Sequence, residues 1–196
     1  MGWNKDNKKA KEWLVVTGSN LVKFKICLLG EGAVGKTSLI KRYVFDEFDE
    51  TYHVTIGTKV TKKELKIRHP ETDETLDVYL MIWDLMGQQC FLDLLKVSYF
   101  FGARGLIAMC DVTRKETLSE LTRWMEVALS VTDDIPIIFL GNKCDLEKEQ
   151  QLSLEEVKTF ASIYDKSETY LSSVKTGYNV DLIFKTLSER MIMNIK

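Results

Sequence analysis

The stretch LVKFKICLLGEGAVGKTSLIKRYV, residues 21–44, joins two regular patterns across a glycine-rich turn. Residues 21–30 form an apolar run of strand length, and residues 35–48 repeat apolar side chains at helical spacing. The turn between them matches the pattern G-x-x-x-x-G-K-[ST]. Its defining residues are Gly30, Gly35, Lys36 and Thr37. An accidental glycine-rich turn is the alternative, but the strand before the motif and the helix after it favour a loop that binds phosphate through backbone N–H groups.

The side chains of this turn predict more than a phosphate contact. Lys36 would reach the β and γ phosphates of a nucleotide. The hydroxyl of Thr37 would bind Mg²⁺, a hard cation that prefers oxygen ligands. The turn therefore predicts a site for a nucleoside triphosphate with its metal ion.

Strand and helix patterns alternate along the rest of the chain. Further strands are predicted at residues 55–67, 76–84, 104–113, 135–145 and 169–176. Further helices are predicted at residues 90–103, 114–132, 153–164 and 180–196. Apolar strands separated by helices predict an α/β fold with a mostly parallel six-stranded sheet and helices on both faces. The short polar turn at 68–75 can join only antiparallel neighbours, so one strand runs against the others.

Composition indicates one globular domain. The chain has 196 residues, a formal net charge of -2 and 45% hydrophobic residues. We expect a domain over residues 21–196 after a polar, lysine-rich extension at 1–20. The small net charge gives no global attraction to nucleic acid. The four cysteines lack metal-binding spacing, so reduced thiols in an intracellular protein are the expectation.

Membrane attachment has no clear signal in this sequence. No apolar run approaches the roughly 18 residues of a spanning helix. Asp6 breaks the myristoylation pattern that begins at Gly2, and the C-terminal MIMNIK has no cysteine for prenylation. We expect a cytoplasmic monomer without a lipid anchor, and peripheral contact with a membrane stays open.

Polar motifs stand where predicted strands end, which is where ligands bind in sheets of this kind. NKCD, residues 142–145, follows a buried strand. Asp145 can accept two hydrogen bonds from guanine, a donor pair that adenine lacks. Asn142 can brace the loop, and the stem of Lys143 can lie along the base. NKCD alone is a weak signal, but after a buried strand and downstream of the phosphate-binding turn it favours guanine.

Two further strand ends complete the set. In SSVKT, Ser173 and Lys175 would line the other side of the base, and the Val174 N–H would donate to the guanine carbonyl. WDLMGQQ, residues 83–89, also ends a strand. There Asp84 would hold a water on Mg²⁺, the Gly87 N–H would meet the γ-phosphate, and Gln88 would orient the attacking water.

These motifs together resemble those of the Ras-superfamily small GTPases. GEGAVGKT, TIG, WDLMGQQ, NKCD and SSVKTGYNV occur in the order and spacing of that superfamily, from about Leu21 to the end of the chain. Trp83 and the segments YFFGARGLIAMCDVT and KTGYNV look most Rab-like. The resemblance implies a P-loop NTPase with a Ras-like G domain that binds GTP or GDP with Mg²⁺.

The resemblance also assigns roles to single residues. It implies that Phe48 packs on the guanine, Tyr52 covers the γ-phosphate, and Gly32 leaves room for an incoming arginine. The superfamily has a segment called switch I, in which one threonine binds Mg²⁺. Among the nearby threonines, spacing from Lys36 favours Thr55 over Thr51 and Thr58 for this role. The implied catalytic residues are Lys36, Gly87 and Gln88. The implied metal ligands are Thr37, Thr55 and Asp84. The implied nucleotide-binding residues are Gly32, Ala33, Val34, Gly35, Lys36, Thr37, Ser38, Phe48, Tyr52, Thr55, Gly87, Asn142, Lys143, Asp145, Leu146, Ser173, Val174 and Lys175.

The segment WDLMGQQ, which lies in the part of the superfamily called switch II, departs from the superfamily pattern. Leu85-Met86 replaces the usual Thr-Ala, and Gln89 replaces the usual Glu. The first hypothesis is a switch that slowly hydrolyses GTP, acts in membrane trafficking or signalling, and works with GTPase-activating, exchange and effector proteins. The second is a GTP-binding scaffold, or pseudo-GTPase, with little turnover, because Met86 would lie close to the γ-phosphate. NKCD and the lack of an arginine-rich lid disfavour an ATP-using kinase.

Overall fold

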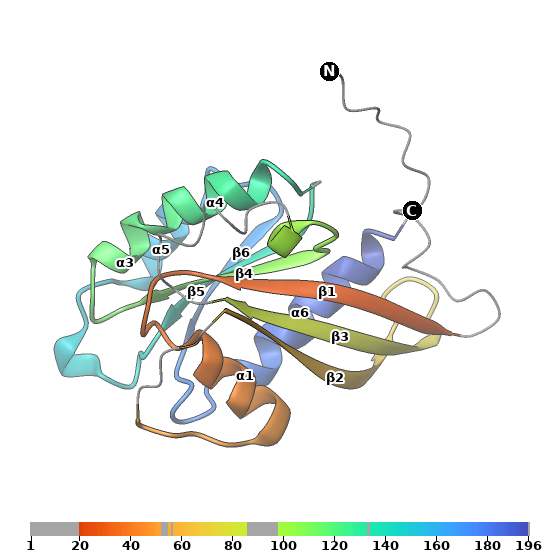
Figure 1. Cartoon of the computed structure of the whole chain (residues 1–196), viewed down its shortest axis with the longest axis horizontal. Helices are drawn as coiled ribbons and strands as arrows, with labels where there is room; N and C mark the ends of the chain where they lie inside the picture. The colour runs from red at the N-terminus through yellow and green to blue at the C-terminus, as the bar shows by residue number, and fades with distance from the viewer. Residues whose placement is uncertain (1–19, 52–54, 56, 86–97, 133, 196) are drawn as a thin grey trace.

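The computed structural model describes residues 20–51, 55, 57–85, 98–132 and 134–195. Its six-stranded sheet has the order β2-β3-β1-β4-β5-β6, with helices on both faces (Figure 1). The strands are β1 (Leu21–Leu29), β2 (Thr58–Arg68), β3 (Thr75–Leu85), β4 (Gly105–Asp111), β5 (Ile137–Asn142) and β6 (Ser167–Ser172). The predicted α/β architecture is confirmed. The predicted extension at residues 1–20 lies, except for its last residue, outside the described residues.

Strand direction follows the length of each connection. β1 pairs in parallel with β3 and β4, and the β4–β5 and β5–β6 pairs are also parallel. β2 and β3 are antiparallel along their whole length, from Thr58 opposite Leu85 to Arg68 opposite Thr75. The antiparallel pair predicted from the 68–75 turn is therefore confirmed.

The helices flank the sheet and differ in extent from their predicted ranges. They are α1 (Lys36–Phe45), α3 (Glu116–Ser119), α4 (Leu121–Leu129), α5 (Leu154–Ala161), α6 (Val180–Met193) and the short 3₁₀ helix η3 (Glu147–Glu149). α5 begins with a capping box, in which the Ser153 hydroxyl accepts from the Glu156 N–H and the Glu156 carboxylate accepts from the Ser153 N–H. The predicted helix at 90–103 lies mostly outside the described residues, and residues 98–100 are helical.

Several boundary predictions were wrong. β2 begins at Thr58 and not at residue 55, β5 ends at Asn142 and not at residue 145, and three other elements also differ. The helix predicted to reach residue 48 ends at Phe45, because Asp46 adopts a left-handed conformation (φ 55°) and caps α1 through its N–H. The helix predicted over 114–132 is two segments, separated at Glu120, whose backbone keeps right-handed helical angles. The last strand begins at Ser167 and ends at Ser172, earlier than predicted, because its register follows β5.

Two apolar layers cover the sheet, one on each face. Along β1, Phe24 and Ile26 belong to the layer shared with α1 and α6, whereas Cys27 and Leu29 belong to the layer shared with α4 and α5. This alternation is the period of a strand buried on both sides. β4 and β5 are buried at every position, which fixes the central strands and the loops that follow them.

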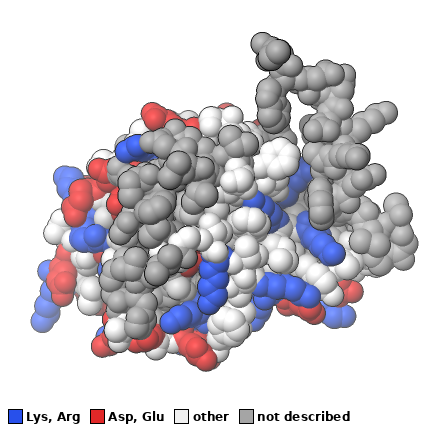
Figure 2. Space-filling model, viewed as in Figure 1, with Lys and Arg blue, Asp and Glu red and all other residues white. Residues whose placement is uncertain are grey.

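β2 forms one edge of the sheet and is exposed at most of its positions. It carries Lys59, Lys62, Lys63, Lys66 and Arg68 against one acidic residue, Glu64. Figure 2 shows both signs of charge across the described part of this face, with Lys and Arg side chains gathered where Figure 1 places β2 and β3. Charged side chains on an edge strand disfavour pairing with another sheet. Within the described part of the chain, no helix is long and apolar enough to cross a bilayer.

Candidate functional site

The loop between β1 and α1 has a backbone that only small residues permit at two points. Gly30 (φ 135°) lies so close to β4 that a Cβ would stand 2.2 Å from the Met109 carbonyl oxygen. Gly35 (φ 106°) precedes α1, and a Cβ there would stand 2.4 Å from Asn142 Nδ2. No side chain caps α1, and its first residues, Lys36, Thr37 and Ser38, line the cavity described below. A loop of this kind suits an anion.

Lys36 folds back along the same loop. Its Nζ donates to the carbonyl oxygens of Gly30 and Glu31, each at 2.7 Å, and the residue is buried. Burial lowers the pKa of Lys36 to about 8, although the nearby carboxylates of Asp84 and Glu31 act in the opposite direction. The lysine is therefore held with its ammonium group beside the phosphate loop. The loop residue Glu31 also accepts a hydrogen bond from the Trp124 indole at 3.3 Å.

Three oxygen-bearing side chains meet next to Lys36. The Thr37 hydroxyl donates to Asp84 Oδ2 at 2.5 Å and lies 2.9 Å from the Thr55 hydroxyl. Burial raises the pKa of the Asp84 carboxyl, a shift that hydrogen bonds and the Lys36 charge counter only in part. Asp84 Oδ1 is buried and has no hydrogen-bond partner among the described residues. Two hydroxyls and a carboxylate with one unused buried oxygen fit Mg²⁺, which prefers oxygen ligands.

Asn142, at the end of β5, ties three segments together. Its Nδ2 donates to the Val34 carbonyl at 2.9 Å. Its Oδ1 accepts from the Ser172 hydroxyl and from the Val174 N–H, both at 3.2 Å. The residue is 2% exposed. Asn142 therefore braces the phosphate loop against β6 and the loop after it, as its position in NKCD predicts.

Several other residues of NKCD and SSVKT line one side of the cavity. Lys143 adopts a left-handed conformation (φ 70°), and its ammonium group lies 2.6 Å from Asp111. Asp145 and Lys175 line the cavity. The Val174 N–H donates to Asn142 in this structure, so its predicted contact with a guanine carbonyl stays a prediction.

Arg42 of α1 forms hydrogen bonds with the loop that follows β6. Its Nε donates to the Val174 carbonyl at 3.0 Å and its Nη2 to the Lys175 carbonyl at 2.6 Å. The guanidinium also lies 5.8 Å from the Phe48 ring and pairs with Asp46. Arg42 therefore connects the segment after α1 to the loop predicted to bind the base.

These elements enclose a cavity of about 310 Å³. Most of the predicted nucleotide-binding residues line it, drawn from the phosphate loop, switch I and the two base loops. They are Gly32, Ala33, Gly35, Lys36, Thr37, Ser38, Phe48, Thr55, Asn142, Lys143, Asp145, Leu146, Val174 and Lys175. Val34 and Ser173 are buried beside the cavity. Tyr52, Gly87 and Gln88 lie outside the described residues.

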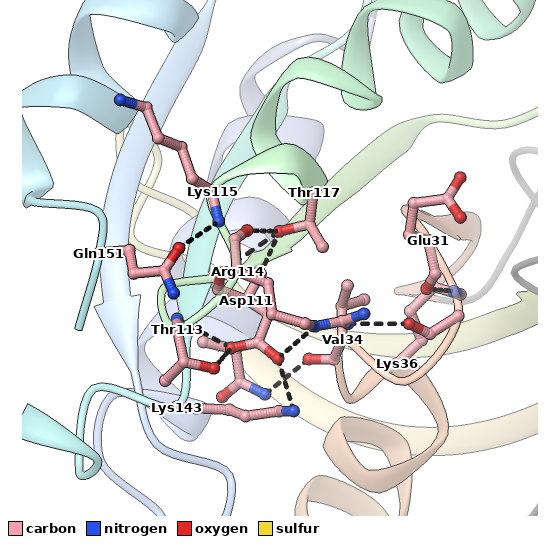
Figure 3. A network of polar contacts seen from close by, with 12 residues as sticks. Glu31, Val34, Lys36, Asp111, Thr113, Arg114, Lys115, Thr117, Lys143 and Gln151 are labelled. Carbon is pink, nitrogen blue, oxygen red and sulfur yellow. Dashed lines mark hydrogen bonds and ion pairs between the residues drawn. The ribbon is translucent and has the colours of Figure 1, made fainter. Parts of the chain in front are cut away.

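The prediction missed several residues of the site. Lys41, Asp49, Glu50 and Leu85 line the cavity, and Glu50 pairs with Lys175 at 2.7 Å. Asp111, the last residue of β4, pairs with Arg114 and Lys143 (Figure 3). Its place at the carboxyl end of a buried strand is the same signal that identified NKCD. Arg42 and Arg114 carry no such signal.

The fold and the cavity define a P-loop protein with a nucleotide-sized cleft. The chain belongs to the Ras family, because the family model for the Ras family matches residues 25–193. As a member it is a GTP-binding small GTPase of the switch type, with GTP-hydrolase activity and with regulator and effector proteins as its general class of partners.

Proposed function

We propose that this protein is a Mg²⁺-dependent switch that hydrolyses GTP slowly unless a partner protein accelerates it. The observation that carries the proposal is the meeting of Thr37, Thr55 and Asp84 beside the buried ammonium group of Lys36. Thr55 lies in the segment between α1 and β2, far from Thr37 along the chain. A site that binds switch I through one hydroxyl can release it when the γ-phosphate leaves.

The proposed reaction is an in-line attack of water on the γ-phosphate. Lys36 would neutralise charge on the β and γ phosphates, and the phosphate-loop N–H groups would bind their oxygens. Thr37, Thr55 and Asp84 would hold the Mg²⁺, which supplies charge neutralisation at the same oxygens when bound. Gln88 would orient the water, and the Gly87 N–H would contact the γ-phosphate. For Ras-like GTPases as a class, a partner's arginine adds roughly 10³–10⁵-fold in rate, and Gly32 leaves room for one.

The recognition of guanine rests on Asp145. Its carboxylate would accept from the two guanine donors, with Lys143 and Phe48 along the ring. Asn142 and Arg42 hold Val174, on the other side of the proposed base site, through the hydrogen bonds described above. Adenine would leave the Asp145 carboxylate without its donor pair, so we expect rejection of ATP.

The test of hydrolysis is phosphate release from GTP in the presence of Mg²⁺. We expect slow release by the wild type, less by Gln88→Leu, and an unchanged rate in the matched control Gln150→Leu, whose side chain donates to the Leu152 carbonyl outside the cavity. A wild type that binds GTP but releases no more phosphate than Gln88→Leu would refute hydrolysis. That result would support the scaffold alternative, which Met86 favours through its predicted place near the γ-phosphate.

The Rab-like features of the sequence, among them Trp83, support a role in membrane trafficking, with signalling as the alternative. We propose a cytoplasmic monomer that reaches membranes through its partners. Capture of proteins by the GTP-locked Gln88→Leu form, compared with the GDP-loaded wild type, tests this role. Partners that bind both forms equally would contradict a switch.

A further inference from the structure

A buried carboxylate lies between the two loops of the nucleotide site. Asp111 is 0% exposed, and donors surround both of its oxygens (Figure 3). Oδ1 accepts from the Thr113 N–H at 3.0 Å and the Thr113 hydroxyl at 2.7 Å. Oδ2 accepts from Arg114 Nε at 3.0 Å and lies 2.6 Å from Lys143 Nζ. The carboxylate is therefore a fixed anchor for two cationic side chains.

Arg114 reaches beyond this anchor to the phosphate loop. Its Nη2 donates to the Gly32 carbonyl at 2.9 Å. The guanidinium thus divides its donors, giving Nε to a carboxylate and Nη2 to a backbone carbonyl. An ammonium group has no such fixed, planar pair of donors, so lysine cannot reproduce this arrangement.

The contacts of Arg114 and Asp111 connect two loops that are proposed to bind the nucleotide. At one end Gly32 belongs to the loop that would bind the β and γ phosphates. At the other end Lys143 belongs to the loop that would hold the base. Arg114 and Asp111 connect them without contacting the cavity, since neither is among the residues that line it.

The charges also favour an anion on the Gly32 side. Asp111 carries one negative charge, whereas Arg114 and Lys143 carry one positive charge each, so the group has one excess positive charge. The Arg114 guanidinium donates to the Gly32 carbonyl of the phosphate loop. Burial is the main cause of the lowered pKa of Lys36, and the Arg114 charge adds to it. The two loops are therefore connected both by hydrogen bonds and by ion pairs.

We propose that Arg114 is a positioning residue that couples the base loop to the phosphate loop through Asp111, and that this coupling retains bound guanine nucleotide. This proposal assumes the guanine-nucleotide binding proposed above. Loss of Arg114 frees the Gly32 carbonyl and leaves Lys143 as the sole ion-pair partner of Asp111 among the described residues. The buried carboxylate stays paired, so the variant should fold, because removal of the only partner of a buried charge is what destabilises strongly.

The test is the rate at which a fluorescent GDP analogue leaves the full chain in excess GDP and Mg²⁺. We expect Arg114→Ala to release it roughly 10–100-fold faster, the range for loss of hydrogen bonds from a charged group. Arg114→Lys should keep the thermal unfolding temperature of the wild type and still release nucleotide faster. The matched control is Arg190→Ala, which removes an arginine paired with Glu168 at 2.7 Å outside the cavity, and its release rate should not change.

A double-mutant cycle distinguishes coupling from simple support. If Asp111 transmits the effect, Arg114→Ala combined with Asp111→Asn, which removes the carboxylate charge and so leaves no buried charge unpaired, should speed release by less than the product of the two single effects. Multiplicative effects would overturn the proposal, as would wild-type release by Arg114→Ala or full rescue by Arg114→Lys. A wild type that fails to bind the GDP analogue would refute the proposed function itself, and the coupling would fall with it.

Discussion

Replacement of Asn142 by alanine tests how the site is held together. Asn142 is 2% exposed, and its side chain connects Val34, Ser172 and Val174 through three hydrogen bonds of 2.9 to 3.2 Å. Asn142→Ala leaves a carbonyl, a hydroxyl and an N–H without this partner. Each belongs to a different segment, so the phosphate loop loses its brace to β6 and to the loop that follows.

The magnitude follows from burial. A buried polar group that loses its partner costs about 1–3 kcal/mol. The three groups share one side chain and relax together, so their costs do not add fully, and we expect about 3 kcal/mol in all. For a chain of this size 1 kcal/mol shifts the midpoint of thermal unfolding by about 2–4 °C. The expected loss is therefore about 6–12 °C.

The assay is thermal unfolding of the nucleotide-free chain, followed by circular dichroism. Asn142→Asp keeps an acceptor for Ser172 and Val174, but it turns a negative oxygen toward the Val34 carbonyl, so it should be no more stable than the alanine variant. Asn20→Ala is the control, because that side chain is exposed and makes only a 3.5 Å contact. If Asn142→Ala unfolds within about 2 °C of the wild type, a shift below 1 kcal/mol, the reasoning from these three hydrogen bonds is refuted.

Three further predictions concern single side chains of the site. Arg42→Ala frees the Val174 and Lys175 carbonyls, and we expect roughly tenfold faster GDP release; an unchanged rate would contradict it. Asp145→Asn should shift base preference from guanine toward xanthine in competition binding, and retained GTP preference would rule out the assigned base site. For Asp111, burial raises the pKa, but hydrogen bonds from Lys143 and Thr113 outweigh it, and the pKa lies below its ordinary value of 3.8. The stability that the ionised carboxylate contributes is therefore present above that value and lost as pH falls through the lower folded pKa. Asp111→Asn should show a flatter stability curve in acid, and parallel urea-unfolding curves would contradict this.

Much of the fold could be predicted because its signals are local. Continuous apolar runs indicated the buried strands, and the turn at 68–75 is too short for anything but an antiparallel pair. The boundary errors have local causes that the pattern does not display. Asp46 ends α1 by adopting a left-handed conformation, a choice that a periodic apolar pattern does not reveal.

The site could be predicted in part for a different reason. Residues that follow parallel strands meet at one edge of the sheet, so the sequence motifs identify most of the cavity lining. The supporting arginines could not be found in this way. Arg42 bonds to Val174 and Arg114 to Gly32, and nothing near either arginine in the sequence indicates which distant carbonyl it meets.

The supporting contacts share one target, which explains how the phosphate loop can be ready for an anion. Side chains donate to four of its carbonyls: Lys36 to those of Gly30 and Glu31, Arg114 to that of Gly32, and Asn142 to that of Val34. In a trans peptide the N–H points opposite to the C=O. Each occupied carbonyl therefore fixes the direction of the next residue's N–H. Donors fixed before binding need little reordering when a phosphate arrives. These side chains, of which only Arg114 lies outside the cavity, thus contribute to nucleotide affinity by orienting the backbone that contacts the nucleotide.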